Sequence, residues 1–549
     1  MIVQITIDNR PCVIERGTTL LQLAQQEQEN YQYQIIAAAL NHEPVGMQSF
    51  PQEGDEVTFY NVTSSTGTRI YQLSLTFVLI KAVRELYADD AELSVEYSLS
   101  TGVFCQLKLA TPLDESEVLR IRQRMAEIID EDLPFTYEPL PKREALEFFR
   151  RERLWERVRL LSYSPDVMVH VYRLGWLHEF FYSPMVPSTG YLKCFDLSYY
   201  EDGFILRFPT QTSPTEIPDF NPSRKLFTIY REAEEWANIL QVRHVPDLND
   251  LSVSGNIMEL IQTAEGLHEK KIAQIADQIA ERRSRLILIS APSSSGKTTF
   301  ANRLAIQLRV NGMRPVTIGL DNYYLNRGEI PLGEDGNPDL ESLFALDIEK
   351  FNDDFIRLLD GEVVDLPVFD FTQGRRAERS NSLRLEEGQP VVIEGIHGLN
   401  PQLTHGIADS TKFRIYLSTL TQLNFDRHNR IYTTDARLLR RIVRDHQFRG
   451  YPVEETLKIW PSVRRGEEKW IFPYYEEADA IFNSHLLYEL AVLKPFALQE
   501  LTKVKPDSVF YTDASRLMQL LSYFKTVDVE SIPHNSILRE FVGGSIFHT

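Results

Sequence analysis

The stretch SAPSSSGKTT at residues 290–299 is the strongest indication of the architecture of the second half of this chain. An apolar run at residues 286–289 precedes it, and a helical pattern of apolar side chains follows from Phe300 to Leu308. A strand, a loop of small residues ending in Gly-Lys-Thr, and a helix form the setting that a phosphate-binding loop requires. Backbone N–H groups of such a loop surround phosphate oxygens, and the positive end of the helix dipole faces them. The stretch therefore predicts a site for a nucleoside triphosphate.

The residues of this loop have separate expected roles. The nucleotide contacts are expected from Ser293, Ser294, Ser295, Gly296, Lys297, Thr298 and Thr299. Lys297 is expected to reach the outer phosphates, and the Thr298 hydroxyl to bind a magnesium ion. The usual pattern opens with glycine where this chain has Ala291, which is a mild departure if the backbone there keeps a negative φ. The alternative is a serine-rich turn with a solvated lysine, which the flanking strand and helix disfavour.

The length, charge and cysteine content set the broad class. A chain of 549 residues is expected to hold several domains. A formal net charge of −20 argues against a broad electrostatic grip on nucleic acid or anionic membrane, while local basic patches stay open. The three cysteines form no CxxC pair, Met1 leads into no signal peptide, and no apolar run is long enough to span a bilayer. A cytoplasmic protein is expected.

Further apolar runs after the loop predict strands that alternate with helices. These runs cover residues 314–320, 390–394, 413–417 and 480–482. The alternation is typical of an α/β fold with a parallel sheet covered on both faces. Ligands in such folds bind beyond the carboxyl ends of the strands.

Two carboxylates stand at those predicted strand ends. Asp321 directly follows the second strand and is expected to accept a proton from an attacking hydroxyl. Its alternative is a helix cap or a turn. Glu394 ends the third strand, where a magnesium-linked carboxylate is expected. Its alternative is a buried structural acid.

A group of arginines repeats at helical spacing near residue 440. Arg437, Arg440, Arg441 and Arg444 occupy positions i, i+3, i+4 and i+7. Clustered arginines repel one another unless an anion gathers them, and phosphates in transfer would do so. The alternative is a solvated face balanced by Asp435 and Asp445.

Together these motifs resemble the uridine kinase and phosphoribulokinase family over about residues 286–484. The matching motifs are residues 290–299, 321–324, 366–371, 391–395 and 436–445. The resemblance implies an ATP-dependent kinase that uses magnesium held by Thr298 and Glu394. It further implies Asp321 as the general base, with Lys297 catalytic and Arg437 and Arg440 in a lid over the phosphates. The implied substrate-binding residues are Asp321, Tyr324, Glu341, Phe369, Arg437 and Arg441.

The positions that would read the base depart from that family. Uridine kinases read the pyrimidine with a tyrosine, a histidine and a glutamine, and the matching positions here are Phe369, Gly374 and Glu455. None of the three can make the same hydrogen bonds, so the preferred nucleoside stays open.

The first half of the chain resembles the front of threonyl-tRNA synthetases. Alternating apolar residues from Ile2 to Ile7 and a helix near Leu20 resemble the β-grasp module called TGS. The next segment resembles the zinc-containing domain that follows TGS in those synthetases. The family's zinc ligands correspond here to Leu73, Phe77, Phe181 and Met185. Because none of these residues binds zinc, packed core is expected in place of a metal site, with no hydrolytic editing chemistry.

The predicted division has five parts. They are a TGS-like β-grasp domain (1–63), a zinc-less synthetase-like α+β domain (64–245), a helical linker (246–283), a uridine kinase-like domain with a phosphate loop (284–490) and a helical extension (491–549). This order resembles a group of bacterial proteins related to nucleoside or uridine kinases. The extension is expected to pack onto the kinase-like domain, and no chemistry is assigned to it.

The favoured function is ATP-dependent phosphoryl transfer to a nucleoside 5′-hydroxyl. One alternative is an ATP-binding protein, RNA-associated or regulatory, that works through its two front domains. Another is a sugar-phosphate kinase, for which no extra phosphate site is evident. No membrane partner is expected, and the oligomeric state stays open.

Overall fold

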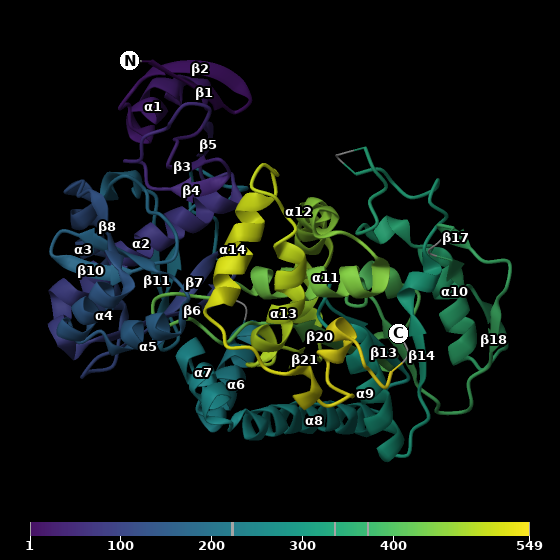
Figure 1. The fold of residues 1–549 in the computed structure, drawn as a ribbon. Coiled ribbons are helices and arrows are strands. Elements are labelled where there is room, and N and C mark those ends of the chain that lie inside the picture. The colour runs from purple at the N-terminus through teal and green to yellow at the C-terminus, as the bar shows by residue number, and fades with distance from the viewer. Residues whose placement is uncertain (1, 221–223, 334–335, 371–372, 548–549) are drawn as a thin grey trace.

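The computed structural model describes residues 2–220, 224–333, 336–370 and 373–547. Met1 and Phe371, which the predictions above include, lie outside the described residues. The chain passes from a small sheet at the top of Figure 1, through a mixed region, to a parallel sheet and a helical C-terminal part. None of the described helices is both long and apolar enough to cross a membrane.

The first sheet has the β-grasp arrangement that the alternating apolar pattern predicts. Its elements are β1 (Ile2–Ile7), β2 (Arg10–Glu15), α1 (Leu20–Glu27), β3 (Ala37–Leu40), β4 (Glu43–Val45) and β5 (Glu56–Tyr60). The strand order is β2-β1-β5-β3-β4. Asp8 and Asn9 adopt φ of 44° and 64°, which the tight hairpin turn between β1 and β2 requires. The Thr19 side chain accepts a hydrogen bond from the Gln22 N–H and so begins α1.

The following region packs two antiparallel sheets around a buried helix. Its elements are α2 (Ser65–Tyr87), β6 (Glu92–Leu99), β7 (Gly102–Lys108), α3 (Glu115–Asp130), β8 (Phe135–Pro141), α4 (Lys142–Arg151), α5 (Trp155–Tyr163), β9 (Met168–Leu174), β10 (Leu177–Phe180), β11 (Asp196–Tyr200), β12 (Gly203–Arg207) and α6 (Arg224–Leu240). The sheets have the orders β11-β12-β7-β6 and β10-β9-β8. Because α2 is apolar on most sides, it lies in the core of this region.

A parallel sheet with the order β14-β19-β13-β20-β21 organises the second half of the chain. Its strands and covering helices are β13 (Leu286–Ser290), α9 (Lys297–Val310), β14 (Val316–Gly319), α10 (Ile348–Leu359), β19 (Val391–Glu394), β20 (Lys412–Ser418), α11 (Thr433–Arg449), α12 (Val453–Trp470) and β21 (Ala480–Asn483). Two short hairpin-like pairs stand beside it: β15 (Val364–Leu366) with β18 (Asn381–Leu383), and β16 (Phe369–Asp370) with β17 (Arg375–Arg376). The predicted strands after residue 286 are confirmed.

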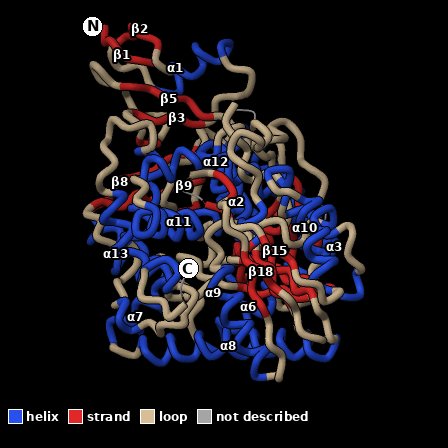
Figure 2. Tube along the Cα trace, turned by 90° about the vertical axis from the view of Figure 1, so that its right-hand side faces the viewer, coloured by secondary structure: helices blue, strands red, loops and turns tan. Residues whose placement is uncertain are grey.

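Two helices connect the halves of the molecule. The predicted linker contains α7 (Val245–Ser254) and α8 (Ile257–Arg282), separated by a turn at Gly255 with φ of 82°. Helix α8 runs along the base of the molecule in Figures 1 and 2. Its Ile272 shares one hydrophobic cluster with Phe149 of α4 and Phe300 of α9, so the core is continuous across the halves.

The C-terminal part returns to the parallel sheet. It contains α13 (Glu489–Leu501), α14 (Tyr511–Ser522) and α15 (Arg539–Val542). Helix α15 packs against α11, and Ile537, which precedes it, rests against Gly296 at the start of α9. This part of the chain is thereby brought to the carboxyl edge of the parallel sheet.

Candidate active site

The loop after β13 has the backbone shape of an anion cradle. Ser294 and Gly296 adopt positive φ of 60° and 80°, and α9 begins at the next residue, Lys297. Left-handed residues of this kind turn successive N–H groups toward one side of a loop. Ala291 is buried and does not have a positive φ, so alanine replaces the usual glycine there without backbone strain.

The carboxyl ends of β14 and β19 bring the two predicted carboxylates together. The parallel register pairs Gly319 with Glu394, and Asp321 follows Gly319 by two residues in a short 3-10 helix. Asp321 is exposed, whereas the Glu394 side chain reaches toward the phosphate loop. The two carboxylates therefore flank the same edge of the sheet.

Glu394 and the neighbouring Thr298 hydroxyl together offer oxygen atoms that could bind a metal ion. The Thr298 hydroxyl donates to the Glu394 Oε1 over 3.4 Å, and the Glu394 Oε2 is buried with no hydrogen-bond partner among the residues that the structure describes. Burial raises the pKa of Glu394 to about 7, against an opposing effect of Lys297. The negative charges of Asp321 and Glu540 add to the rise, so both lie close to it. A hydroxyl beside a carboxylate with a free buried oxygen fits magnesium, which prefers oxygen ligands.

Tyr324 and Phe369 form an aromatic corner next to Asp321. Their ring centroids lie 5.8 Å apart, and the Tyr324 hydroxyl donates to the Leu340 carbonyl over 2.9 Å. The Asn322 side-chain oxygen accepts from the Phe369 N–H over 3.2 Å. The predicted substrate residues on this side of the site are therefore near neighbours.

Glu341 lies between this corner and the phosphate loop. Burial raises its pKa to about 7, the charge of Glu467 adds to the rise, and Arg441 and Lys297 oppose it. Its Cβ would be only 2.3 Å from a Cβ added at Gly466, so α12 packs directly against it. A carboxyl group in this position is close to both the loop lysine and the α11 arginines.

Two of the positions that depart from uridine kinases lie on separate elements. Gly374 forms the turn between β16 and β17 with φ of 62°, next to the Arg327 side chain. Glu455 lies in the first turn of α12. Of the three base-reading positions, Phe369 is the one that stands beside Tyr324 in the aromatic corner.

The α11 arginines are buried in ion pairs with protein carboxylates. Arg437 is 2% exposed and pairs with Glu467, and Arg440 is 0% exposed and pairs with Glu489. Arg441 bonds to Asp445 over 3.1 Å. The face is therefore not solvated at Arg437, Arg440 and Arg441, and protein carboxylates are the anions that gather these arginines. Of the two carboxylates in the solvated-face alternative, Asp445 does pair with Arg441 and with the half-buried Arg444, whereas Asp435 pairs with other arginines.

The same arginines donate hydrogen bonds to oxygen atoms of the phosphate loop. Arg437 donates to the Ser293 carbonyl over 3.0 Å, and Arg440 donates to the Ser294 carbonyl over 3.4 Å. Arg441 donates to the Ser293 hydroxyl over 2.8 Å. Their guanidinium groups thus contact the loop's oxygen atoms, and their predicted place in a lid over the phosphates is not a feature of this conformation.

Glu467 is a site residue that the sequence analysis missed. Its Oε1 accepts from the Ser293 N–H over 3.1 Å, and Arg464 joins Arg437 in pairing with it. Ser293 is therefore bonded to the protein through its N–H, its carbonyl and its hydroxyl. Ser293 is expected to contact the nucleotide, but in this structure its N–H donates to Glu467.

The buried ion pairs make the free energy of unfolding depend on pH in the acid range. Burial would raise the pKa of Glu489, but Arg440 and His485 lower it to about 2, and Glu179 beside Arg157 behaves in the same way. A folded pKa below the ordinary value of 4.5 contributes stability above that value, which is lost as pH falls toward the folded pKa. We expect the urea midpoint to fall between about pH 5 and about pH 3. Glu489→Gln should lose less over that interval, and an unchanged wild-type midpoint would contradict this prediction.

The four positions that correspond to zinc ligands in synthetases are packed core. Leu73, Phe77, Phe181 and Met185 are each at most 5% exposed and belong to one hydrophobic cluster. The rings of Phe77 and Phe181 lie 5.2 Å apart. Apolar side chains therefore stand at the positions where metal ligands would be needed.

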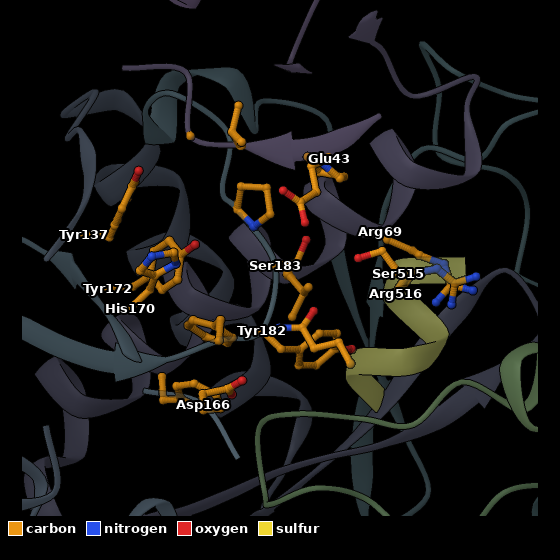
Figure 3. A pocket seen from close by; sticks show the side chains of 18 of the residues that line it. Glu43, Arg69, Tyr137, Asp166, His170, Tyr172, Tyr182, Ser183, Ser515 and Arg516 are labelled. Carbon is orange, nitrogen blue, oxygen red and sulfur yellow. The ribbon is translucent and has the colours of Figure 1, made fainter. Parts of the chain in front are cut away.

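A cavity of about 620 Å³ lies next to this packed core, between the first sheet, the synthetase-like region and α14. Figure 3 shows Tyr137, His170 and Tyr172 on one side of it and Arg69 and Arg516 on the other. Both arginines pair with the buried Asp435, over 2.7 and 2.5 Å, and Arg516 also pairs with Asp513 over 2.9 Å, so their charge is balanced within the protein.

Comparisons with known proteins follow the two halves of the chain. Residues 286–487 match the family model described as Phosphoribulokinase / Uridine kinase family. A threonine–tRNA ligase of Desulforamulus reducens is 28% identical over 182 residues, which are 33% of this chain and 28% of that protein. A uridine kinase of Macrococcus caseolyticus is 27% identical over 200 residues, which are 36% of this chain and 87% of that protein.

Solved structures give a weaker likeness. A possible uridine kinase from Bacillus stearothermophilus has 19% identity and a TM-score of 0.26, and the match covers 38% of this chain and 98% of that one. The chain spans less than a third of the length of the threonine–tRNA ligases that it matches. Residues 286–487 therefore form a domain of the phosphoribulokinase and uridine kinase family, in a chain whose other similarity is to threonine–tRNA ligases.

Proposed function

We propose that this protein transfers the γ-phosphoryl group of ATP to the 5′-hydroxyl of a nucleoside. The observation that carries the proposal is the meeting of Lys297, Thr298, Asp321 and Glu394 at the carboxyl edge of the parallel sheet. Ligands of open α/β sheets bind at this edge. Phosphoryl transfer mainly requires positioning, charge neutralisation and a base, and these residue types supply all three.

The proposed chemistry assigns one role to each group. The acceptor hydroxyl oxygen forms a bond to the γ-phosphorus, the bond from that phosphorus to the ADP oxygen breaks, and Asp321 takes the hydroxyl proton. Lys297 and the N–H groups of the loop neutralise the phosphates. Thr298 and Glu394 would hold magnesium, which when bound screens the charge of the phosphate oxygens.

A neutral acceptor is favoured over a sugar phosphate. A phosphorylated acceptor needs a second set of cations, and the α11 arginines nearest the loop are already paired with Glu467, Glu489 and Asp445. Relatives named uridine kinase support a nucleoside. The identity of the base stays open, because Phe369, Gly374 and Glu455 lack the hydrogen-bonding groups of uridine kinases. A cytoplasmic location also remains a prediction.

Glu394→Gln should weaken the metal site specifically. The substitution removes the charge that attracts the cation but keeps the shape of the side chain. We expect the magnesium concentration for half-maximal ATP binding to rise by about tenfold to a hundredfold. Thr298→Ser, which retains the hydroxyl, serves as the matched control and should bind magnesium as the wild type does. An unchanged magnesium requirement in Glu394→Gln would remove Glu394 from the metal site.

The direct test of the function combines binding with turnover. ATP binding in the presence of magnesium is measured by calorimetry, and ADP release is measured with a panel of purine and pyrimidine nucleosides. Stimulation of ADP release by one nucleoside class supports the proposal. Retained ATP binding without stimulation by any nucleoside, together with co-purifying RNA, would favour the alternative of an RNA-associated or regulatory protein.

A further inference from the structure

The C-terminal segment lies directly on the phosphate loop. Glu540, in the short helix α15, accepts a hydrogen bond at Oε2 from the backbone N–H of Thr299 over 3.0 Å. Thr299 is the third residue of α9, so its N–H has no partner within the helix. A carboxylate at this position is stabilised by the positive end of the helix dipole. Glu540 therefore occupies a place that suits a phosphate group.

Apolar side chains dock the same segment onto the loop. A Cβ added at Gly296 would lie 2.3 Å from Cγ2 of Ile537, so this side chain rests against the glycine of the loop. The Phe541 ring lies 5.1 Å from the guanidinium carbon of Arg440 in α11. Ile537 and Phe541 are fully buried, whereas Glu540 is half-buried. The apolar contacts fix the segment, and the half-buried carboxylate is the part that can move.

Glu540 brings a second negative charge close to Glu394, and this placement costs electrostatic free energy. Glu540 lies close enough to Glu394 for their negative charges to interact, and Lys297 is the nearby cation that acts on Glu394. Two carboxylates beside one lysine repel each other, and the hydrogen bond to Thr299 offsets that repulsion. An incoming triphosphate would bring further negative charge to the same space and would compete with Glu540.

From these contacts we infer that Glu540 is an internal mimic of phosphate, and that the C-terminal segment 536–542 restrains nucleotide binding from within the chain. The inference rests on the proposed function of the loop as the ATP site. In the restrained state the carboxylate holds the first turn of α9. When ATP binds, the Glu540 side chain turns outward, and the Thr299 N–H bonds to the nucleotide.

The test compares ATP binding by variants of the full-length protein. Glu540→Ala removes the acceptor, and Glu540→Gln keeps its shape but removes the charge. We expect both to bind ATP with magnesium more tightly than the wild type, by about tenfold for Glu540→Ala and less for Glu540→Gln. The matched control is Glu530→Gln, which makes the same change at an exposed position in the short 3-10 helix Val529–Ser531 that precedes the segment, and which should bind as the wild type does.

Hydrogen exchange supplies a second readout that does not depend on turnover. On addition of ATP and magnesium to the wild type, residues 291–299 should exchange more slowly, whereas the backbone of residues 536–542, which the apolar contacts hold in place, should exchange at an unchanged rate. Equal affinity of the wild type and both Glu540 variants, or weaker binding by the variants, would overturn the inference while the ATP site stands. Absence of ATP binding in every variant would overturn both the inference and the proposed function. Tighter binding by the variants without turnover of any nucleoside would support the inference and count against the nucleoside kinase proposal.

Discussion

Asp321→Asn should lower the rate of nucleoside-dependent ADP release by about 10²–10⁴-fold, the usual contribution of a general base. Asparagine matches aspartate in shape but cannot accept the hydroxyl proton. The side chain is exposed at the end of β14, so the substitution removes no core packing. The charge of Asp321 also raises the pKa of Glu394, so its loss should leave the metal side of the site at least as well ionised. ATP binding should therefore stay close to that of the wild type.

This result separates a base from a residue that only shapes the site. The rate is measured at saturating ATP and nucleoside, and ATP affinity is measured separately by calorimetry. Asp353→Asn, on the exposed surface of α10, is the matched control and should leave both quantities unchanged. A rate for Asp321→Asn within a few-fold of the wild type would show that another group accepts the proton.

Arg440→Met should destabilise the protein by about 3–5 kcal/mol, because it leaves Glu489 charged and buried without its partner. Both side chains are at most 1% exposed, and Arg440 also donates to the Ser484 and Ser294 carbonyls. Methionine keeps much of the volume of arginine, so the effect measures the lost pairing more than a cavity. ATP affinity should fall as well, since the Ser294 carbonyl is part of the loop.

The double variant Arg440→Met, Glu489→Leu provides the control. Replacing both partners of a buried ion pair by apolar residues removes the uncompensated charge and is often close to neutral. We therefore expect the double variant to recover most of the stability that the single variant loses, as measured by urea unfolding. A single variant within about 1 kcal/mol of the wild type would mean that the pair is not what holds α11 to α13.

The sequence was sufficient to predict the elements that carry the loop. Apolar runs such as residues 390–394 are confirmed as strands of the parallel sheet, because a strand buried on both faces needs continuous apolar residues. Parallel register then places the ends of β14 and β19 side by side, so the neighbourhood of Asp321 and Glu394 follows from the fold class.

The charged partners of the loop could not be predicted in the same way. An arginine repeat on a helix has the same spacing whether it faces solvent, phosphate or buried carboxylates. Its partner Glu467 is 30 residues from Arg437, and Glu540 is 241 residues from the Thr299 N–H that it contacts. The C-terminal extension was expected to pack as helices without chemistry. The packing is observed, but Glu540 brings a charge to the site that no local pattern indicates.

Transfer of label from ATP labelled in its γ-phosphate shows whether phosphate held by the loop around Lys297 is passed to a nucleoside. The label is followed in the wild type, in Glu540→Ala and in Asp321→Asn. We expect label in a nucleoside 5′-monophosphate, formed faster by Glu540→Ala at limiting ATP and nearly absent with Asp321→Asn. If label stays in ATP, or appears only as inorganic phosphate, in both the wild type and Glu540→Ala while ATP is bound, the protein does not transfer phosphate to a nucleoside.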